Sequence, residues 1–248
     1  ELLIAETENF LHVNNISAHK LWGIGMSMPG LINPKQGINL TYSNLTASNT
    51  SLTELLEKHF GIPVYLFNDT KATTIGEHRF GGAIDKSHVL TVNIDWGVGL
   101  GIILNGEVFN GTSGFAGELG HIQVKPNGLL CHCGKIGCLD TITSAWALVR
   151  QAKEGIKSGR ATILTQMVKN DLDILDTTHI VEAVHAGDEF SIDLLSIVGT
   201  ELGKGLATAV HLFNPEVIII GGLLAEAGTF ISNPIEQSIN KYCLSDFK

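Results

Sequence analysis

The chain has 248 residues, a net charge of −9 and a hydrophobic content of 44%. This length suffices for one large domain or two small ones, and the apolar content is typical of a well-packed globular protein. The acidic balance argues against a nucleic-acid-binding face on these residues. No apolar run approaches the roughly 18 residues of a membrane span, and we expect no signal peptide, so the sequence predicts a cytoplasmic protein without a membrane partner.

Apolar patterns along the chain predict alternating strands and helices. Short apolar runs predict strands at residues 21–28, 62–67, 89–94, 98–104 and 217–220. Longer patterns predict helices at residues 1–19, 51–61, 70–79, 141–157 and 190–212, with a polar, irregular helical insert at 158–180. The alternation indicates an α/β protein with mainly parallel strand pairing.

Three local signals refine this outline. Ser51 and Glu54 match a capping box, in which each side chain pairs with a free amide at the start of a helix. Two apolar strands followed by the hairpin turn Asn105-Gly106 suggest that a new sheet begins near residue 90. We therefore divide the chain into an N-terminal lobe, residues 1–89, and a C-terminal lobe, residues 90–248.

Two stretches at strand ends have alternative interpretations. Asp69 follows the strand at 62–67, and open α/β sheets bind ligands beyond the carboxyl ends of their strands. Asp69 is therefore either a helix N-cap or a catalytic base that faces a cleft. The glycine run at 97–101 is either a phosphate cradle or a place where the backbone packs closely in a sheet.

The strongest chemical signal lies between residues 117 and 140. His121, Cys131, Cys133 and Cys138 supply one nitrogen and three sulfurs, the set that structural zinc favours in a closed four-coordinate site. The alternative is three buried or redox-active cysteines beside an ordinary histidine. Clustered cysteines in a cytosolic chain are more often metal-binding or catalytic than disulfide-bonded, so we predict a structural zinc loop.

The same stretch resembles the signature of the ROK family (repressors, open reading frames and sugar kinases). The matching residues are Gly-Glu-Leu-Gly-His at 117–121 and Cys-x-Cys-Gly-x-x-Gly-Cys-Leu-acid at 131–140. The resemblance extends to Met-Pro-Gly at 28–30, Asn-Asp at 68–69 and the glycine run. It is closest to the N-acetylglucosamine-repressor and xylose-repressor type of transcriptional regulator.

This resemblance implies a fold and a binding site. The fold would be a two-lobed α/β fold of the actin-like, RNase H-like ATPase type, with a sugar cleft between the lobes and a zinc-binding loop. The sugar pocket carried over from the family would use Gly30, Asn68, Asp69, Glu118, His121 and Asp140. His121 would bind zinc through one ring nitrogen and face the sugar with the other, because metal ligation fixes its tautomer.

Two departures from the family pattern bear on function. The family usually has glutamate at the position of Asp140, whose carboxylate is withdrawn by about 1.5 Å, the length of one carbon–carbon bond. In the family's kinases Asp69 is the catalytic base, and a later phosphate loop resembles Gly-Thr-Gly-x-Gly-x-Gly. Here Asp95 and Trp96 replace the first Gly-Thr, and a carboxylate beside a bulky indole is a poor neighbour for phosphate.

We therefore predict the sugar-sensing domain of a transcriptional regulator of carbohydrate metabolism. An ATP-dependent sugar kinase, with Mg-ATP as its cofactor, is the alternative. The chain opens at Glu1 as if inside a helix and stops at Lys248 just after one, so we expect a fragment of a longer protein. The resemblance further implies a DNA-binding helix-turn-helix upstream of these residues, and a homodimer or tetramer.

Overall fold

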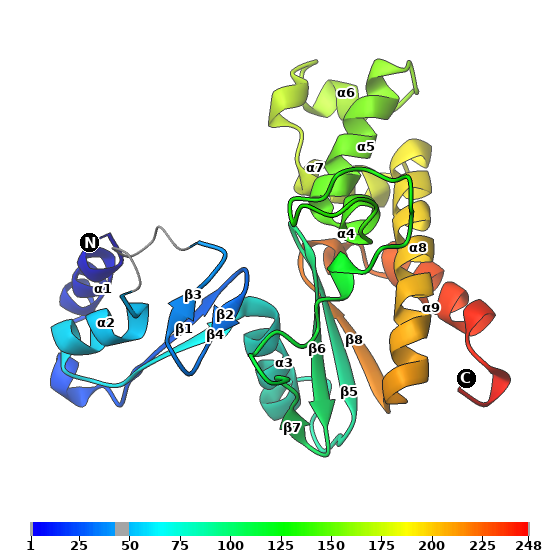
Figure 1. Ribbon diagram of the computed structural model, residues 1–248. Helices are drawn as coiled ribbons and strands as arrows, with labels where there is room; N and C mark the ends of the chain where they lie inside the picture. The colour runs from blue at the N-terminus through cyan, green and yellow to red at the C-terminus, as the bar shows by residue number, and fades with distance from the viewer. Residues whose placement is uncertain (1, 43–49, 248) are drawn as a thin grey trace.

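We describe residues 2–42 and 50–247 of the chain from a computed structural model (Figure 1). The secondary structure forms two lobes, one around residues 2–68 and the other around residues 89–247, with helix α3 where they meet. Every helix in the described ranges is too short or too polar to cross a lipid bilayer.

The elements have the following bounds. The strands are β1 (Ile24–Met28), β2 (Ile32–Asn33), β3 (Ile38–Asn39), β4 (Val64–Asn68), β5 (Val89–Ile94), β6 (Val98–Leu104), β7 (Glu107–Val108) and β8 (Val217–Gly221). The α-helices are α1 (Leu2–Val13), α2 (Leu52–Phe60), α3 (Asp69–Phe80), α4 (Asp140–Thr143), α5 (Ala145–Lys157), α6 (Leu164–Met167), α7 (Thr177–His185), α8 (Glu189–Phe213) and α9 (Thr229–Tyr242). Short 3-10 helices are η1 (Ala18–Lys20), η3 (Leu119–His121), η4 (Leu172–Ile174), η5 (Leu223–Ala227) and η6 (Ser245–Phe247).

The N-terminal lobe is built on a parallel pair of strands. β1 pairs with β4 in a register that sets Met28 opposite Asn68, so both strands end at the same edge. Helix α2 packs on this pair, with Leu56 and Leu66 in the buried cluster between them. As predicted, Ser51 caps α2, because its side chain accepts a hydrogen bond of 3.2 Å from the amide three residues later.

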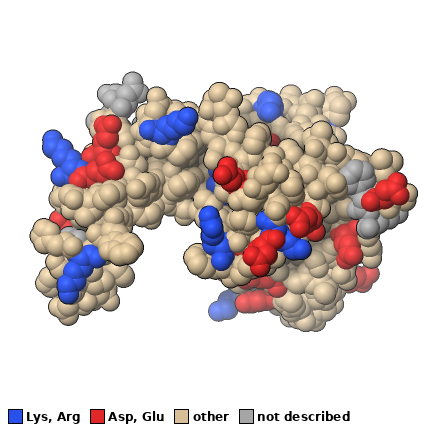
Figure 2. Space-filling view, turned by 90° about the horizontal axis from the view of Figure 1, so that it is seen from below, with Lys and Arg blue, Asp and Glu red and all other residues tan. Residues whose placement is uncertain are grey.

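The C-terminal lobe contains a four-stranded sheet in the order β7-β6-β5-β8. Strand β5 is parallel to β8 and antiparallel to β6. Asn105 and Gly106, with φ angles of 54° and 79°, turn β6 back onto β7, which confirms the predicted hairpin. On the face seen from below in Figure 2, an open notch separates the two lobes, and acidic and basic side chains are interspersed.

The prediction of mainly parallel pairing was wrong. Only β1–β4 and β5–β8 are parallel among the described strand pairs, whereas β2–β3, β5–β6 and β6–β7 are antiparallel. The connections decide the direction, because a parallel crossover needs a dozen or more residues. Only residues 95–97 separate β5 from β6, so these two strands can pair in the antiparallel sense alone.

The helix predicted at 141–157 is two helices. Ser144 has an extended backbone, with φ −74° and ψ 163°, and separates α4 from α5. Its hydroxyl caps α5 by accepting a hydrogen bond of 3.2 Å from the amide of Ala147. The glycines of α8 allow a close helix approach, since a Cβ on Gly199 would lie 2.8 Å from Pro234 of α9.

Helix α3 lies directly on strand β6. A Cβ on Gly99 would lie 2.1 Å from the hydroxyl of Thr70, and one on Gly101 would lie 1.7 Å from that of Thr74. The close-packing interpretation of the glycine run is therefore confirmed at these two positions. Because β5 begins at Val89, a new sheet starts where the sequence indicated, although the division into domains 1–89 and 90–248 stays a prediction.

Candidate functional site

The cysteine-rich loop is closed by its own hydrogen bonds. It follows η3, and the amide of Cys131 donates to the carbonyl of Lys135 at 2.7 Å. The ammonium of Lys135 donates to the carbonyl of His121 at 2.8 Å, which ties the far end of the loop to its start. An isolated antiparallel β-bridge between Gln123 and Cys138 pairs the two ends of the loop. Backbone contacts therefore bring side chains that lie up to 17 residues apart onto one centre.

The four predicted ligands meet at this centre. The sulfurs of Cys133 and Cys138 lie 3.6 Å apart, and Cys131 Sγ lies 3.7 Å from His121 Nδ1. One ligand atom from each of the four residues lies within 4.8 Å of all the others. Tetrahedral zinc with bonds of about 2.0–2.3 Å places its ligands roughly 3.5–3.8 Å apart, so the donor set and its spacing fit such an ion. The cluster could hold a metal ion.

The cysteines of the cluster are free rather than disulfide-bonded. Burial, together with the neighbouring sulfurs of Cys131 and Cys133, raises the pKa of Cys138 to about 12. Burial also raises the pKa of Cys131. A thiol binds a metal ion as the thiolate, so binding here has to release protons.

His121 faces both the cluster and a carboxylate. Its Nδ1 points to Cys131, and its Nε2 lies 3.8 Å from Oε2 of Glu118. Partial burial raises the pKa of Glu118, while the nearby charges of His121 and Lys71 act to lower it. The two ring nitrogens of His121 are thus directed to two different groups, as a shared metal and ligand role would require.

The ends of β1 and β4 carry the second group of predicted site residues. The side-chain amide of Asn68 donates to the carbonyl of Gly30 at 3.1 Å. Its oxygen accepts from the amide of Lys71 at 3.2 Å, so Asn68 is the N-cap of α3. The interpretation of Asp69 as the N-cap was therefore wrong. Asp69 is the first residue of the helix, and its carboxylate accepts a hydrogen bond of 2.7 Å from the adjacent amide of Thr70.

The surroundings of Asp69 disfavour its charged form. Burial raises its pKa, and the negative charge of Asp95 adds to the effect, although the hydrogen bond from Thr70 opposes it. Asp69 and Asp140 both interact electrostatically with Glu118. Asp69, His121 and Asp140 are therefore close enough to Glu118 for their charges to act on it, while Gly30 and Asn68 are hydrogen-bonded to each other where α3 begins.

Asp140 is the most buried of these carboxylates. It begins α4, its side chain is only 6% exposed, and burial raises its pKa. Its Oδ1 accepts a hydrogen bond of 2.6 Å from the amide of Val98. Its other oxygen, Oδ2, lies 3.9 Å from Nδ1 of His132. One oxygen therefore positions the carboxylate, and the other faces the site.

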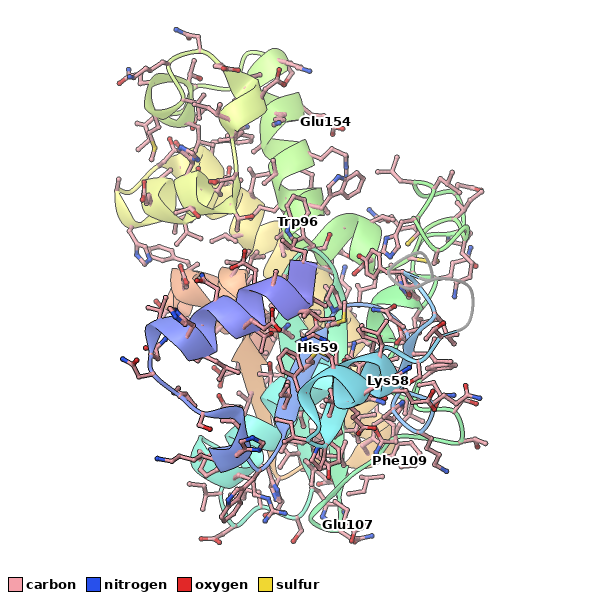
Figure 3. The ribbon with its side chains drawn as sticks, turned by 90° about the vertical axis from the view of Figure 1, so that its left-hand side faces the viewer. Lys58, His59, Trp96, Glu107, Phe109 and Glu154 are labelled. Atoms are coloured by element: carbon pink, nitrogen blue, oxygen red, sulfur yellow. The ribbon has the colours of Figure 1, made fainter. Side chains whose placement is uncertain are left out.

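Asp95 connects two strands of the C-terminal sheet. Its Oδ2 accepts from the side-chain amide of Asn93, and its Oδ1 accepts from the backbone amide of Leu223, both at 2.8 Å. Leu223 begins η5, directly after β8. The next residue, Trp96, is 76% exposed and lies at the opposite end of the sheet from Glu107 (Figure 3).

Sequence reasoning missed Lys71 and did not single out His132. Lys71 is buried, and its ammonium donates to Oδ1 of Asn110 at 3.2 Å and to the carbonyl of Gly114. Burial lowers its pKa, while the charge of Glu118 acts to raise it. The only sequence signal was a lysine two residues after Asp69, on a helix face of small side chains. Such a lysine usually points to solvent, and only the tertiary fold shows otherwise.

The fold and this site define the class of protein. The sequence pattern of the ROK family matches residues 1–248, and the chain belongs to that family. It is 32% identical to the glucokinase of Thermotoga maritima over 225 residues, 90% of this chain and 71% of the relative. It is 34% identical to the N-acetylglucosamine repressor of Escherichia coli O157:H7 over 229 residues, 92% of this chain and 55% of the relative.

Solved structures of both kinds share its architecture. A ROK family transcriptional regulator, a homolog of the E. coli MLC protein, superposes with a TM-score of 0.87 at 34% identity, covering 99% of this chain and 61% of the other. A ROK family glucokinase from Streptomyces griseus, in complex with glucose and AMPPNP, gives 0.83 at 31% identity, covering 91% and 73%. The predicted two-lobed, actin-like α/β fold is confirmed. The chain spans little more than half the length of the repressor.

Proposed function

We propose that this chain is the sugar-binding, effector-sensing part of a ROK family transcriptional regulator. A neutral sugar offers hydroxyls, and its pocket needs groups that accept and donate in pairs, because an unpaired buried polar group costs roughly 1–3 kcal/mol. Asp69, Glu118, His121 and Asp140 form a group of that kind, and Gly30 and Asn68 adjoin it. The relatives include repressors and glucokinases at almost equal identity, so the choice between sensing and catalysis rests on the site.

The main support for sensing rather than catalysis is the hydrogen bond from the backbone amide of Leu223 to the carboxylate of Asp95. Backbone amides at a helix start are natural partners for phosphate oxygens. Here the amide of Leu223 is already bonded to the carboxylate of Asp95, and that negative charge also lies close enough to act on Asp69. An incoming phosphate would meet both like-charge repulsion and the exposed indole of Trp96. A sensor needs sugar contacts but no phosphate contacts, so it tolerates this arrangement.

Zinc is the ion we propose for the cysteine-rich loop, held by His121, Cys131, Cys133 and Cys138. Three sulfurs and one imidazole nitrogen form a closed structural set with no position left for a substrate. The ion would supply cross-linking of the loop and a fixed tautomer of His121. The chain's own contribution is to direct His121 Nε2 at Glu118, where both can contact the same sugar.

A sugar kinase is the second candidate, and Asp69 is the observation that favours it. A general base works best when its pKa is raised toward the working pH, and burial raises that of Asp69. As a kinase residue, Asp69 would take the proton of a sugar hydroxyl that attacks the terminal phosphate of Mg-ATP.

For the regulator, we propose DNA binding through a helix-turn-helix outside these residues, in a homo-oligomer.

Two measurements test the choice. Titration calorimetry of the 248-residue chain with glucose, N-acetylglucosamine and xylose should detect binding of at least one sugar. Full-length protein mixed with the same sugars and Mg-ATP should show no sugar-dependent ATP turnover. Sugar phosphorylation at an ordinary enzymatic rate would favour the kinase over the regulator. A chain that binds none of the three sugars would contradict both proposals.

A further inference from the structure

His132 lies beside the proposed sugar contacts His121 and Asp140. It stands between Cys131 and Cys133, and its side chain is 70% exposed. Its ring meets that of His121 edge to face, with centroids 5.1 Å apart and an interplanar angle of 70°. The imidazole therefore lines the same site as His121 and remains open to a ligand.

The site contains two imidazole–carboxylate pairs of nearly equal spacing. His121 Nε2 lies 3.8 Å from Glu118 Oε2. His132 Nδ1 lies 3.9 Å from Asp140 Oδ2. Both distances exceed that of a direct hydrogen bond, about 2.7–3.2 Å. A hydroxyl group can accept from a ring N–H and donate to a carboxylate, so each gap suits one bridging hydroxyl.

The free oxygen of Asp140 makes the second pair available for binding. Its Oδ1 is used by the amide of Val98, and Oδ2 is the oxygen directed at His132. One ligand atom each of His121, Cys131, His132 and Asp140 lies within 4.8 Å of the others, and His132 Nδ1 also lies 3.8 Å from Cys131 Sγ. Since the two rings are in contact, two bound hydroxyls would be neighbours, which is the geometry of a vicinal diol on a sugar ring.

We propose that His132 and Asp140 form a second hydroxyl-binding pair beside His121 and Glu118, and that together the two pairs recognise a vicinal diol. This inference rests on the proposed sugar-binding function and adds His132 as a residue that determines specificity. A sugar that lacks the hydroxyl bound by the second pair leaves a buried carboxylate oxygen of Asp140 without a partner. Sites built to hydrogen-bond a hydroxyl reject the analogue without it for this reason.

The test couples a change in the protein with a change in the ligand. The 248-residue chain and its His132→Ala and His132→Gln variants are titrated with whichever of glucose, N-acetylglucosamine and xylose binds, and with the monodeoxy analogues of that sugar. We expect His132→Ala to bind the parent sugar about tenfold more weakly. One deoxy analogue should bind the unchanged chain about tenfold more weakly than the parent sugar. His132→Ala should distinguish that analogue from the parent less strongly than the unchanged chain does, because only Asp140 of the pair remains.

His12→Ala is the matched control, because His12 is also an exposed histidine but lies on α1, away from the site. If no sugar binds the unchanged chain, both the proposed function and this inference fail. If a sugar binds but His132→Ala and His132→Gln discriminate the deoxy analogues as the unchanged chain does, only the inference fails. It also fails if His132→Ala removes a bound metal ion, because His132 would then be a metal ligand.

Discussion

Two regions contribute to the candidate site, and they are built in different ways. The first is the strand-edge group, made of Gly30, Asn68 and Asp69, which regular pairing of β1 with β4 and the start of α3 hold in place. The second is the metal loop, residues 117–140, where irregular backbone converges on four side-chain donors. Secondary structure alone orients the first group, whereas we propose that metal ligation orients His121 in the second, so the two regions should respond to different perturbations.

The largest effect should come from breaking the metal loop. We expect Cys133→Ser to lose at least a hundredfold in zinc affinity, because a hydroxyl is a poor replacement for a thiolate ligand. Sugar affinity should fall with it, since His121 loses its orientation. Cys133 is exposed, so the substitution leaves the buried core intact. Metal analysis and calorimetry measure the two losses.

Cys243→Ser is the control for this change, as the fourth cysteine lies outside the cluster and contacts the carbonyl of Ala207. It should retain a full equivalent of metal and unchanged sugar affinity. Full metal content in Cys133→Ser would refute the assignment of the loop as a four-ligand site.

A smaller effect should come from the strand-edge group. Asn68→Ala removes both the N-cap of α3 and the hydrogen bond to Gly30, and should lower the free energy of unfolding by about 1–2 kcal/mol. Asn68→Asp keeps an accepting cap but cannot donate to Gly30, so it should lose sugar affinity with less loss of stability. Both variants should keep their metal, which chemical denaturation and metal analysis will show. Loss of metal in either would mean that the two regions are not independent.

The smallest effect concerns the charge of Asp69. Because the folded-state pKa of Asp69 is raised, its ionised form opposes folding at pH values above the unfolded pKa, and the penalty is complete above the folded pKa. Asp69→Asn should therefore raise the melting temperature by a few degrees at most near pH 7. The gain should vanish below about pH 3.8, where both side chains are neutral. A variant that is less stable at neutral pH would contradict this sign.

The sequence was sufficient where local chemistry decides the structure. Strands β5 and β6 have the predicted bounds, because two continuous apolar runs are separated by polar residues. The same holds for the Ser51 cap and the Asn105-Gly106 hairpin, each of which depends on a few adjacent residues. The four predicted zinc ligands were selected by residue type and spacing, and the structure brings them together in a group that could hold a metal ion.

The sequence was insufficient where competition between neighbours or tertiary packing decides. Asn68 and Asp69 are both residue types that cap helices well. Because Asn68 pairs with Met28, it is the last residue of β4 and therefore the N-cap of α3. In the sequence, Ser144 is an ordinary residue within a helical pattern. Only the structure shows that it is the N-cap of α5. The burial of Lys71 arises from a loop almost 40 residues away, which no periodicity can reveal.

The position of α3 has a consequence for how the protein responds to a ligand. Thr70 and Thr74 pack this helix closely onto Gly99 and Gly101 of the C-terminal sheet, whereas β4 belongs to the N-terminal lobe. The peptide between Asn68 and Asp69 therefore joins the two lobes. A sugar held by both of these side chains would bridge the lobes at their junction.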